Sequence, residues 1–201
     1  MDSHYLGLIS YASALVRQED ARQTLLQSGL SGVVLGFEPE PVITCGVRAA
    51  DHDLEFSREE ISRRGFSILP VDRGGQATVH NPGQLVIFPV WPIRAIGVRN
   101  WVMSLAEITR ECLAEWKIEA TWKDEQPGLH TCRGKIMACG VRVKQGISTH
   151  GIAINVRNDL ADFRLIRSCG VQSAVIDRMG EEILLSDVYK VWTEKFRRAH
   201  G

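Results

Sequence analysis

The sequence predicts a single α+β domain over residues 1–201, built on a mixed, largely antiparallel sheet flanked by helices. Short runs rich in β-branched residues outnumber the helical segments and often follow one another directly. No repeat, low-complexity tract or Ser/Pro-rich linker divides the chain. With 44% hydrophobic and 24% charged residues, a chain of 201 residues is expected to bury one sizeable core.

The first third of the chain is expected to contain two helices and a pair of strands. Apolar positions between residues 11 and 27 predict a helix, and a glycine follows as its stop. The runs 32–37 and 42–45, separated by Glu-Pro-Glu-Pro, predict a hairpin-like pair of strands. Within 57–65, a serine followed three residues later by a glutamate has the spacing of a capping box and predicts a short helix.

The remainder is expected to contain three strands and two helices. Residues 85–90 form an apolar run that two prolines are expected to end. Residues 100–117 carry apolar side chains at helical spacing and predict the best amphipathic helix of the chain. The runs 135–144 and 151–156 predict strands, the second with clean alternation of side chains, and 186–199 predicts a final helix.

The charge balance predicts neither a nucleic-acid partner nor a membrane partner. Lysine plus arginine equals aspartate plus glutamate, at 24 each, so no global field attracts polyanions. No apolar run approaches the ~20 residues that span a bilayer, and the first residues lack the regions of a signal peptide. The five cysteines lack CxxC spacing and are expected to be reduced thiols, which predicts a cytoplasmic location.

The stretch 73–84 has the composition of a ligand-binding loop. Three glycines, a proline, an arginine and a histidine lie within twelve residues, between two apolar runs. Glycine allows backbone N–H groups to approach a ligand that a side chain would block. Arg73 and His80 supply a fixed charge and a titratable group. An ordinary Gly/Pro loop between two strands is the alternative interpretation.

Cys169 and Lys135 are candidates for nucleophilic catalysis. Cys169 stands in a small-residue turn, and Lys135 opens a strand that is otherwise apolar. An ammonium within a few ångströms favours the thiolate of a cysteine, which is the reactive form, and the lysine could also transfer a proton. The alternatives are a free thiol at Cys169 and an edge-strand lysine that protects against aggregation.

The sequence favours neither a metal nor a nucleotide cofactor. Four possible zinc ligands match no common zinc-finger spacing: His130, Cys132, Cys139 and His150. A phosphate-binding loop at Gly134-Lys135 is excluded, because Gly128 lies one residue too far away and Ile136 replaces the required Ser or Thr.

Three separated segments resemble the lipoyl(octanoyl) transferase family. Residues 72–85 (DRGGQATVHNPGQL) resemble its signature RGG-xx-T-Y-H-G-P-G-Q-L. Residues 134–143 (GKIMACGVRV) and 149–156 (THGIAINV) resemble its block K-I-A-x-x-G-V-R … H-G-x-A-L-N-V. Ser168-Cys169-Gly170 resembles its P-C-G active-site turn, and weaker similarity extends over most of the chain.

The resemblance implies a cytoplasmic, monomeric acyltransferase that shares its fold with biotin and lipoate protein ligases. The family moves an octanoyl group from acyl carrier protein to a lysine on the lipoyl domains of 2-oxoacid dehydrogenases and on the glycine-cleavage H protein. By position, Cys169 matches the cysteine that carries the acyl thioester, and Lys135 the lysine that lowers its pKa. The positions that match substrate-binding segments are Arg73, Gly74, Gly75, Gln76, Ala77, Thr78, Val79, His80, Ala138, Cys139, Gly140, Gly151, Ile152 and Ala153.

This chain departs from the family pattern at three positions. Val79 stands where the family has tyrosine, which removes a hydroxyl from the expected pocket wall. Asn81 replaces a glycine and is expected to stiffen the loop or to adopt a left-handed backbone. Ser168 replaces the proline before Cys169.

Three other functions compete with octanoyl transfer from a carrier protein. The first is an ATP-dependent lipoate or octanoate ligase, which has a related fold and needs no nucleophilic cysteine. The second is an amidotransferase that moves octanoyl between two lipoyl-type proteins. The third is a catalytically inactive module that binds lipoyl domains.

Overall fold

Two β-sheets meet in this molecule, and their strand order fixes where a ligand can bind. The computed structural model describes residues 1–28, 32–167 and 175–201. Within this part of the chain, the large sheet runs in the order β1 (Asp2–Ile9), β2 (Val33–Pro39), β6 (Gln84–Pro92), β10 (Ile147–Asn155), β9 (Gly134–Lys144), β8 (Gly128–Thr131), β7 (Thr121–Trp122). The small sheet has the order β4 (Ser67–Pro70), β3 (Val42–Cys45), β5 (Ala77–His80).

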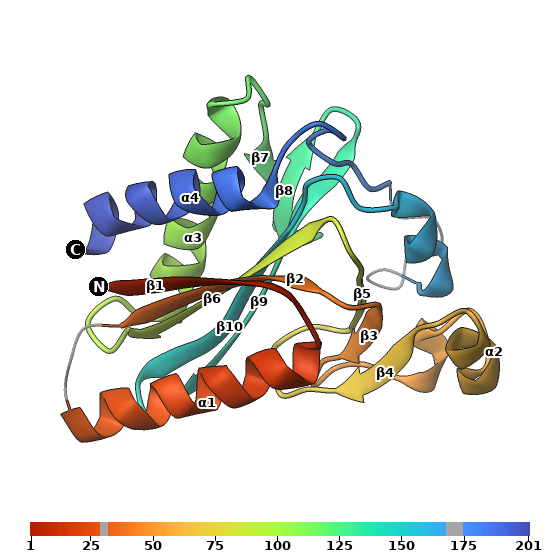
Figure 1. Cartoon of the computed structure of the whole chain (residues 1–201), viewed down its shortest axis with the longest axis horizontal. Coiled ribbons are helices and arrows are strands. Elements are labelled where there is room, and N and C mark those ends of the chain that lie inside the picture. The colour runs from red at the N-terminus through yellow and green to blue at the C-terminus, as the bar shows by residue number, and fades with distance from the viewer. Residues whose placement is uncertain (29–31, 168–174) are drawn as a thin grey trace.

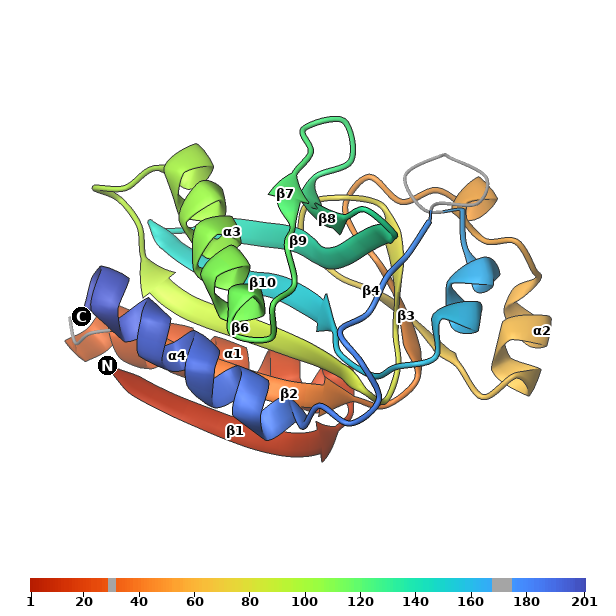
Figure 2. The same cartoon turned by 90° about the horizontal axis from the view of Figure 1, so that it is seen from above.

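Helices cover the two faces of the large sheet unequally. α3 (Val98–Ala114) and α4 (Leu185–His200) lie together on one face, and α1 (Tyr11–Ser28) crosses the opposite face (Figures 1 and 2). The short helix α2 (Arg58–Arg63) packs beside the small sheet, and two 3₁₀ turns are formed by Asp51–Asp53 (η1) and Leu160–Leu165 (η2). The two pairs β1–β2 and β3–β4 are parallel and the other paired strands are antiparallel, so the predicted α+β class with a mixed, largely antiparallel sheet is confirmed.

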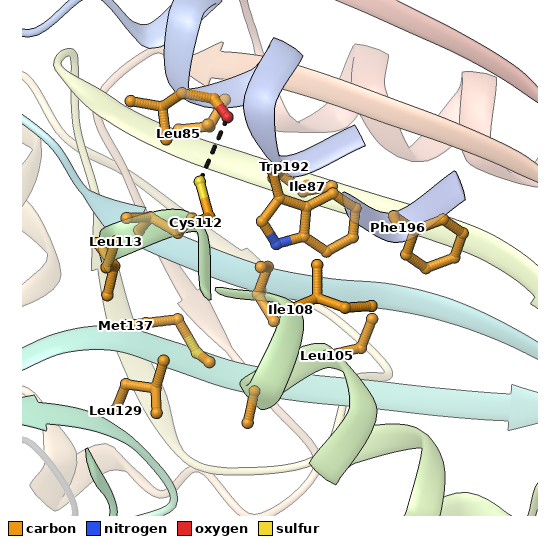
Figure 3. Close-up of a cluster of buried hydrophobic side chains, with 14 of the residues drawn as sticks. Leu85, Ile87, Leu105, Ile108, Cys112, Leu113, Leu129, Met137, Trp192 and Phe196 are labelled. Carbon is orange, nitrogen blue, oxygen red and sulfur yellow. Dashed lines mark hydrogen bonds between the residues drawn. The ribbon is translucent and has the colours of Figure 1, made fainter. Parts of the chain in front are cut away.

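The main core lies between the large sheet and the α3–α4 pair. Figure 3 shows Trp192 of α4 between Cys112 of α3 and Phe196 of α4, among aliphatic side chains of the sheet. The Cys112 thiol is fully buried and donates a hydrogen bond to the Val188 carbonyl. Burial raises its pKa to about 12. Cys112 therefore acts as a small core residue.

Most of the predicted elements are confirmed close to their expected bounds. The helices at 11–28, 98–114 and 185–200 each lie within three residues of the expected ends. The capping box at α2 is present: the Ser57 hydroxyl accepts from the Glu60 N–H, and the Glu60 carboxylate accepts from the Ser57 N–H. No helix in the described ranges is long and apolar enough to cross a membrane.

The predicted hairpin of residues 32–37 and 42–45 is wrong, because β2 and β3 belong to different sheets. Pro39 and Pro41 remove two N–H donors that a hairpin ladder would need. The N–H between them, of Glu40, donates to the Ile9 carbonyl of β1 instead. The chain thus leaves the large sheet at this point and starts the small one.

Further strands differ from the expectation: β5, which lies within the predicted loop 73–84, was not predicted, nor were β7 and β8, and β10 begins four residues before its expected start. β1 was not predicted, because this edge strand is largely exposed and carries no clear apolar alternation. β6 continues through Pro89, which was expected to help end it. Pro89 lies opposite Val34 of β2, and the ladder to β10 is interrupted between Ser148 and Ile152, so the missing N–H falls where that ladder is already interrupted.

Candidate active site

A pocket with a cavity volume of about 130 Å³ lies on the α1 face of the large sheet, where the glycine-rich loop (residues 73–76) approaches it. Thirteen of the fourteen residues expected to bind substrate line this pocket, and so does Lys135. The exception is Val79, which is fully buried with Ile43 and Ile61 in the core of the small sheet. Because its side chain points away from the pocket, the loss of the family's tyrosine hydroxyl at this position does not change the pocket wall.

The pocket floor is built from small residues that pair across neighbouring strands. Gly151 of β10 pairs with Gly140 of β9, and Ala153 pairs with Ala138. A Cβ on Gly140 would lie 2.9 Å from the Gly74 carbonyl oxygen, so only glycine lets the loop approach this closely. The result is a trough whose base is mostly backbone and methyl groups.

Cys139 and Ile152 contribute to this wall differently from their neighbours. They pair with each other across β9 and β10, one residue from the alanine pair. Side chains alternate along a strand, and both side chains pack in the core beneath α3 and α4. They therefore contribute backbone atoms to the pocket.

Polarity changes along the trough. At one end Gln84 of β6 pairs with Asn155 of β10, next to Lys135 in the pocket wall. Two residues further along each strand, Val86 pairs with Ala153, and the wall beyond is formed by Phe88 and the glycines. The pocket thus has a polar end and an apolar end.

A chain of hydrogen bonds leads from Arg73, whose aliphatic stem lies against Gly140, to the polar end of the pocket. The buried Arg73 guanidinium donates from Nη2 to the Thr44 carbonyl and to Thr44 Oγ1, each over 2.7 Å. Thr44 Oγ1 lies 3.2 Å from His80 Nε2, and His80 Nδ1 lies 2.6 Å from Gln84 Oε1. Gln84 Nε2 then donates to Asn155 Oδ1 over 2.9 Å.

The donor and acceptor roles in this series of hydrogen bonds assign the protonation state of His80. Thr44 Oγ1 accepts from Arg73, so its own proton is available to His80 Nε2. Because the Gln84 amide donates onward, its oxygen accepts the proton of His80 Nδ1. His80 is therefore neutral. Burial, reinforced by the charge of Arg73, lowers its pKa to about 3.

Two hydrogen bonds fix the glycine-rich loop to the sheet. The Gly74 N–H donates to the Val141 carbonyl over 3.1 Å. His150 Nε2 lies 2.7 Å from Asp72 Oδ1, and its backbone has the left-handed φ of 55°. The His150 side chain is almost fully buried, and its contact with Asp72 holds the start of the loop against β10. The backbone conformation of His150 is uncommon for a residue other than glycine.

Lys135 is anchored through its backbone. Its N–H donates to the Val175 carbonyl over 2.8 Å, and its carbonyl accepts from the Asp177 N–H over 3.0 Å. Cys169, the predicted nucleophile, and Ser168 lie outside the described residues. The described residues Phe163 and Ile176, which precede and follow that part of the chain, both line the pocket.

Asn81 does not adopt the left-handed backbone considered for it, whereas Gly83 does, at φ 89°. The Asn81 amide donates to Asp162 Oδ2 over 2.6 Å and to the Asp159 carbonyl over 2.8 Å. It also accepts from Asn158. In place of glycine, this side chain joins the loop to the 3₁₀ turn η2.

The four residues weighed as zinc ligands do not come together. His150 contacts Asp72, and His130 Nε2 lies 3.0 Å from the Gln126 carbonyl. No group of three or more residues suited to a metal forms within 1–28, 32–167 and 175–201. The four described cysteines, Cys45 among them, are free thiols.

Comparisons with known proteins show which family this chain belongs to. Residues 10–197 match the family model described as the lipoyl protein ligase A/B catalytic domain. The chain belongs to this family.

Two curated relatives are named octanoyltransferase. The protein of Alkaliphilus metalliredigens is 35% identical over 182 residues, which cover 89% of this chain and 83% of the relative. The protein of Koribacter versatilis is 31% identical over 202 residues, which cover 95% and 80% of the two chains. The resemblance identified from the three motifs is thus confirmed.

A solved structure shares the fold of this family member. It is a putative lipoate protein ligase of Thermoplasma acidophilum with bound lipoic acid, with a TM-score of 0.78 and 13% sequence identity. The alignment covers 98% of this chain and 84% of that one. The predicted ligase-like fold is confirmed.

Several pocket residues of this lipoyl ligase A/B domain were missed from the sequence. Gln84 and Asn155 lie within the matched motifs, and a polar residue on the inward side of an apolar strand is a signal that could have identified both. Tyr11 begins α1 and stacks on His80, with ring centroids 4.9 Å apart. Arg48 also lines the pocket. Nothing in the local sequence distinguishes Tyr11 or Arg48.

Proposed function

We propose that this chain transfers an octanoyl group from acyl carrier protein to a lysine of lipoyl domains, through a thioester on Cys169. The acceptors would be the lipoyl domains of 2-oxoacid dehydrogenases and the glycine-cleavage H protein. The proposal includes a monomeric enzyme in the cytoplasm, where thiols stay reduced. The family assignment and the relatives named octanoyltransferase support an acyltransferase activity of this kind.

The observation that carries the proposal is the polarity gradient of the pocket. A strand rises about 3.4 Å per residue, so the row of Asn155 lies roughly 14 Å from the row of Gly151. An extended eight-carbon chain, with C–C bonds of about 1.5 Å, measures roughly 9 Å. With its carbonyl at the polar end, it would end between the rows of Ala153 and Gly151. Burying its methylenes favours binding by ~0.8 kcal/mol each before ordering costs.

The first step exchanges one thioester for another. The Cys169 thiolate attacks the octanoyl carbonyl, the C–S bond to the carrier breaks, and the carrier thiolate takes up a proton. Lys135 favours the thiolate of Cys169 and can supply that proton. Because one thioester replaces another, the step needs no ATP.

The second step forms an amide. The amine of the acceptor lysine attacks the Cys169 thioester, its surplus proton passes to a base, and the Cys169 sulfur leaves. Neutral Lys135, left after the first step, can accept that proton. Backbone N–H groups of the glycine-rich loop are suited to stabilise the oxyanion in both steps. His80 is a hydrogen-bond partner in the wall rather than the base, because its two nitrogens are already engaged.

Intact-protein mass spectrometry tests the proposal. Wild type and Cys169→Ser are mixed with octanoyl–acyl carrier protein in the absence of ATP. We expect wild type to gain one octanoyl group that hydroxylamine removes, and the variant to form no thioester. Modification of an acceptor domain only when octanoate and ATP are supplied would instead establish a ligase. Transfer only from an octanoylated lipoyl-type protein would establish an amidotransferase, and no transfer at all a binding module.

A further inference from the structure

The side chain of Lys135 lies across a glycine of the neighbouring strand. Gly128 of β8 pairs with Ala138 of β9, so both face the pocket. A Cβ built on Gly128 would lie 2.5 Å from Lys135 Cε and 3.3 Å from Lys135 Nζ. Carbon atoms pack at about 3.5–4.0 Å. The lysine stem therefore occupies the space that a side chain at 128 would fill.

An irregularity in β9 directs Lys135 to this position. The pairing of β8 with β9 shifts between Leu129, opposite Met137, and His130, opposite Lys135. One extra residue, Ile136, is thus accommodated in β9, and both Ile136 and Met137 pack in the α3–α4 core. Without the bulge, Lys135 would share the core face with Met137. A β-bulge re-aims the side chain next to it, here into the pocket.

Gly128 fits this bulge in its backbone as well. Its φ of 149° lies in the range that favours glycine, and a Cβ would also collide with the Met137 carbonyl oxygen. Glycine is therefore required at position 128 for two reasons: its own backbone conformation and the lysine stem that covers it.

We propose that Gly128 is a positioning residue, which leaves open the groove in which the Lys135 side chain lies and so holds its ammonium at the polar end of the pocket. This inference rests on the proposed function, since it assigns a partner to the lysine that is to act on the nucleophile.

The test is a double-mutant cycle on acyl-enzyme formation, measured in single turnovers with octanoyl–acyl carrier protein. In Gly128→Ala the methyl group displaces the ammonium, and a misplacement of about 1 Å can cost about 100-fold in rate. We expect that order of loss, with little change in KM. Adding Lys135→Ala to Gly128→Ala should cause almost no further loss in rate, because each change takes the Lys135 ammonium away from the polar end of the pocket. If the two losses multiply, Gly128 has a separate structural role and the inference is wrong.

Gly97→Ala is the matched control. Gly97 also has a positive φ, at 77°, but a Cβ there would have no atom within 4 Å. It lies in the turn before α3, so this variant carries the backbone cost of alanine without touching Lys135. We expect it to react at the wild-type rate.

A second measurement needs no variant. In wild-type protein we expect a nuclear Overhauser effect between the Gly128 Hα and Lys135 Hε protons, and its absence would overturn the inference even if Gly128→Ala fails to fold. The cycle also separates the two proposals. If Lys135→Ala alone leaves acyl-enzyme formation unchanged, the role of Lys135 in the proposed function fails, while the Overhauser effect still decides whether Gly128 holds the side chain.

Discussion

At the residue scale, the pocket holds a histidine that folding keeps uncharged. His80 is almost fully buried, stacks on Tyr11, and has both ring nitrogens in hydrogen bonds. A second proton would have to be placed between Nε2 and a hydroxyl that already receives hydrogen bonds from Arg73. The neutral ring is thus required by geometry and by desolvation together.

The first prediction concerns acid stability. The folded-state pKa of His80 is about 3 and the unfolded value is about 6.5, so the unfolded chain binds one more proton between these values. The stabilising effect is complete above pH 6.5 and is lost as the pH falls toward 3. In His80→Gln we expect the free energy of unfolding to depend less on pH in this window, by up to about 1.36 kcal/mol per pH unit. Urea unfolding at pH 4, 5, 6 and 7 measures both slopes, and equal slopes would contradict the assignment.

The second prediction concerns Lys135, whose role follows from the proposed chemistry. In Lys135→Ala the pKa of the Cys169 thiol should rise, because the cation that favours the thiolate is gone. Acyl-enzyme formation near neutral pH should slow about tenfold for each unit of that rise. The pH profile of thiol alkylation by iodoacetamide measures the pKa directly. A profile identical to wild type would exclude this role for Lys135.

At the scale of elements, three adjacent strands set the shape of the pocket. β6, β10 and β9 each place alternate residues on the α1 face, and the register aligns small residues into cross-strand rows. Ala153 occupies the middle of the trough, between Val86 and Ala138. The length of acyl chain that fits therefore depends on the strand register and on the size of the side chains in the row of Ala153.

The third prediction tests this register. Ala153→Val adds two methyl groups at the middle of the trough, so an octanoyl chain should lose about 10- to 200-fold in kcat/KM while butyryl is affected much less. The measurement compares kcat/KM for four-, six- and eight-carbon acyl donors. Ile154→Val, one residue away, changes the opposite face and should keep the wild-type preference. If Ala153→Val lowers kcat/KM equally for all three donors, the size of the side chains in this row does not determine the acyl chain length that the pocket accepts.

At the scale of the whole molecule, the main core and the pocket lie on opposite faces of one sheet. The α3–α4 pair covers one face with the main aromatic and aliphatic core (Figures 2 and 3). The pocket opens on the other face, beside α1 and the small sheet. Tyr189 of α4 lies over Gly36 of β2, and its hydroxyl donates to the Val34 carbonyl over 2.8 Å.

The fourth prediction tests whether a change on the α3–α4 face affects the pocket on the opposite face. In Gly36→Ala the new methyl group would collide with the Tyr189 ring and push α4 from the sheet. We expect a loss of about 1–3 kcal/mol in the free energy of unfolding, typical of overpacking. The rate of acyl-enzyme formation per folded molecule should not change. Urea unfolding and single-turnover kinetics provide the two values, and a parallel loss of rate would show that the faces are coupled.

The sequence by itself determined the fold class, three long helices to within three residues of their observed ends, and the segments that meet at the pocket. These features are local: helical spacing, strand alternation and a capping box act between residues close in the chain. Motifs of consecutive residues likewise identified Arg73, His80 and Lys135 as candidate site residues, because the residues of one motif lie in the same loop or strand.

Only the tertiary structure decided which strands pair and which side of each strand faces the pocket. Three features depend on register between distant segments: the separation of β2 from β3, the burial of Val79 in the core of the small sheet, and the bulge that places the Lys135 side chain over Gly128. A shift of one residue exchanges the two faces of a strand, and no local pattern specifies such a shift. The segments that line the pocket were therefore readable from residue types, whereas the geometry of the pocket was set by long-range pairing.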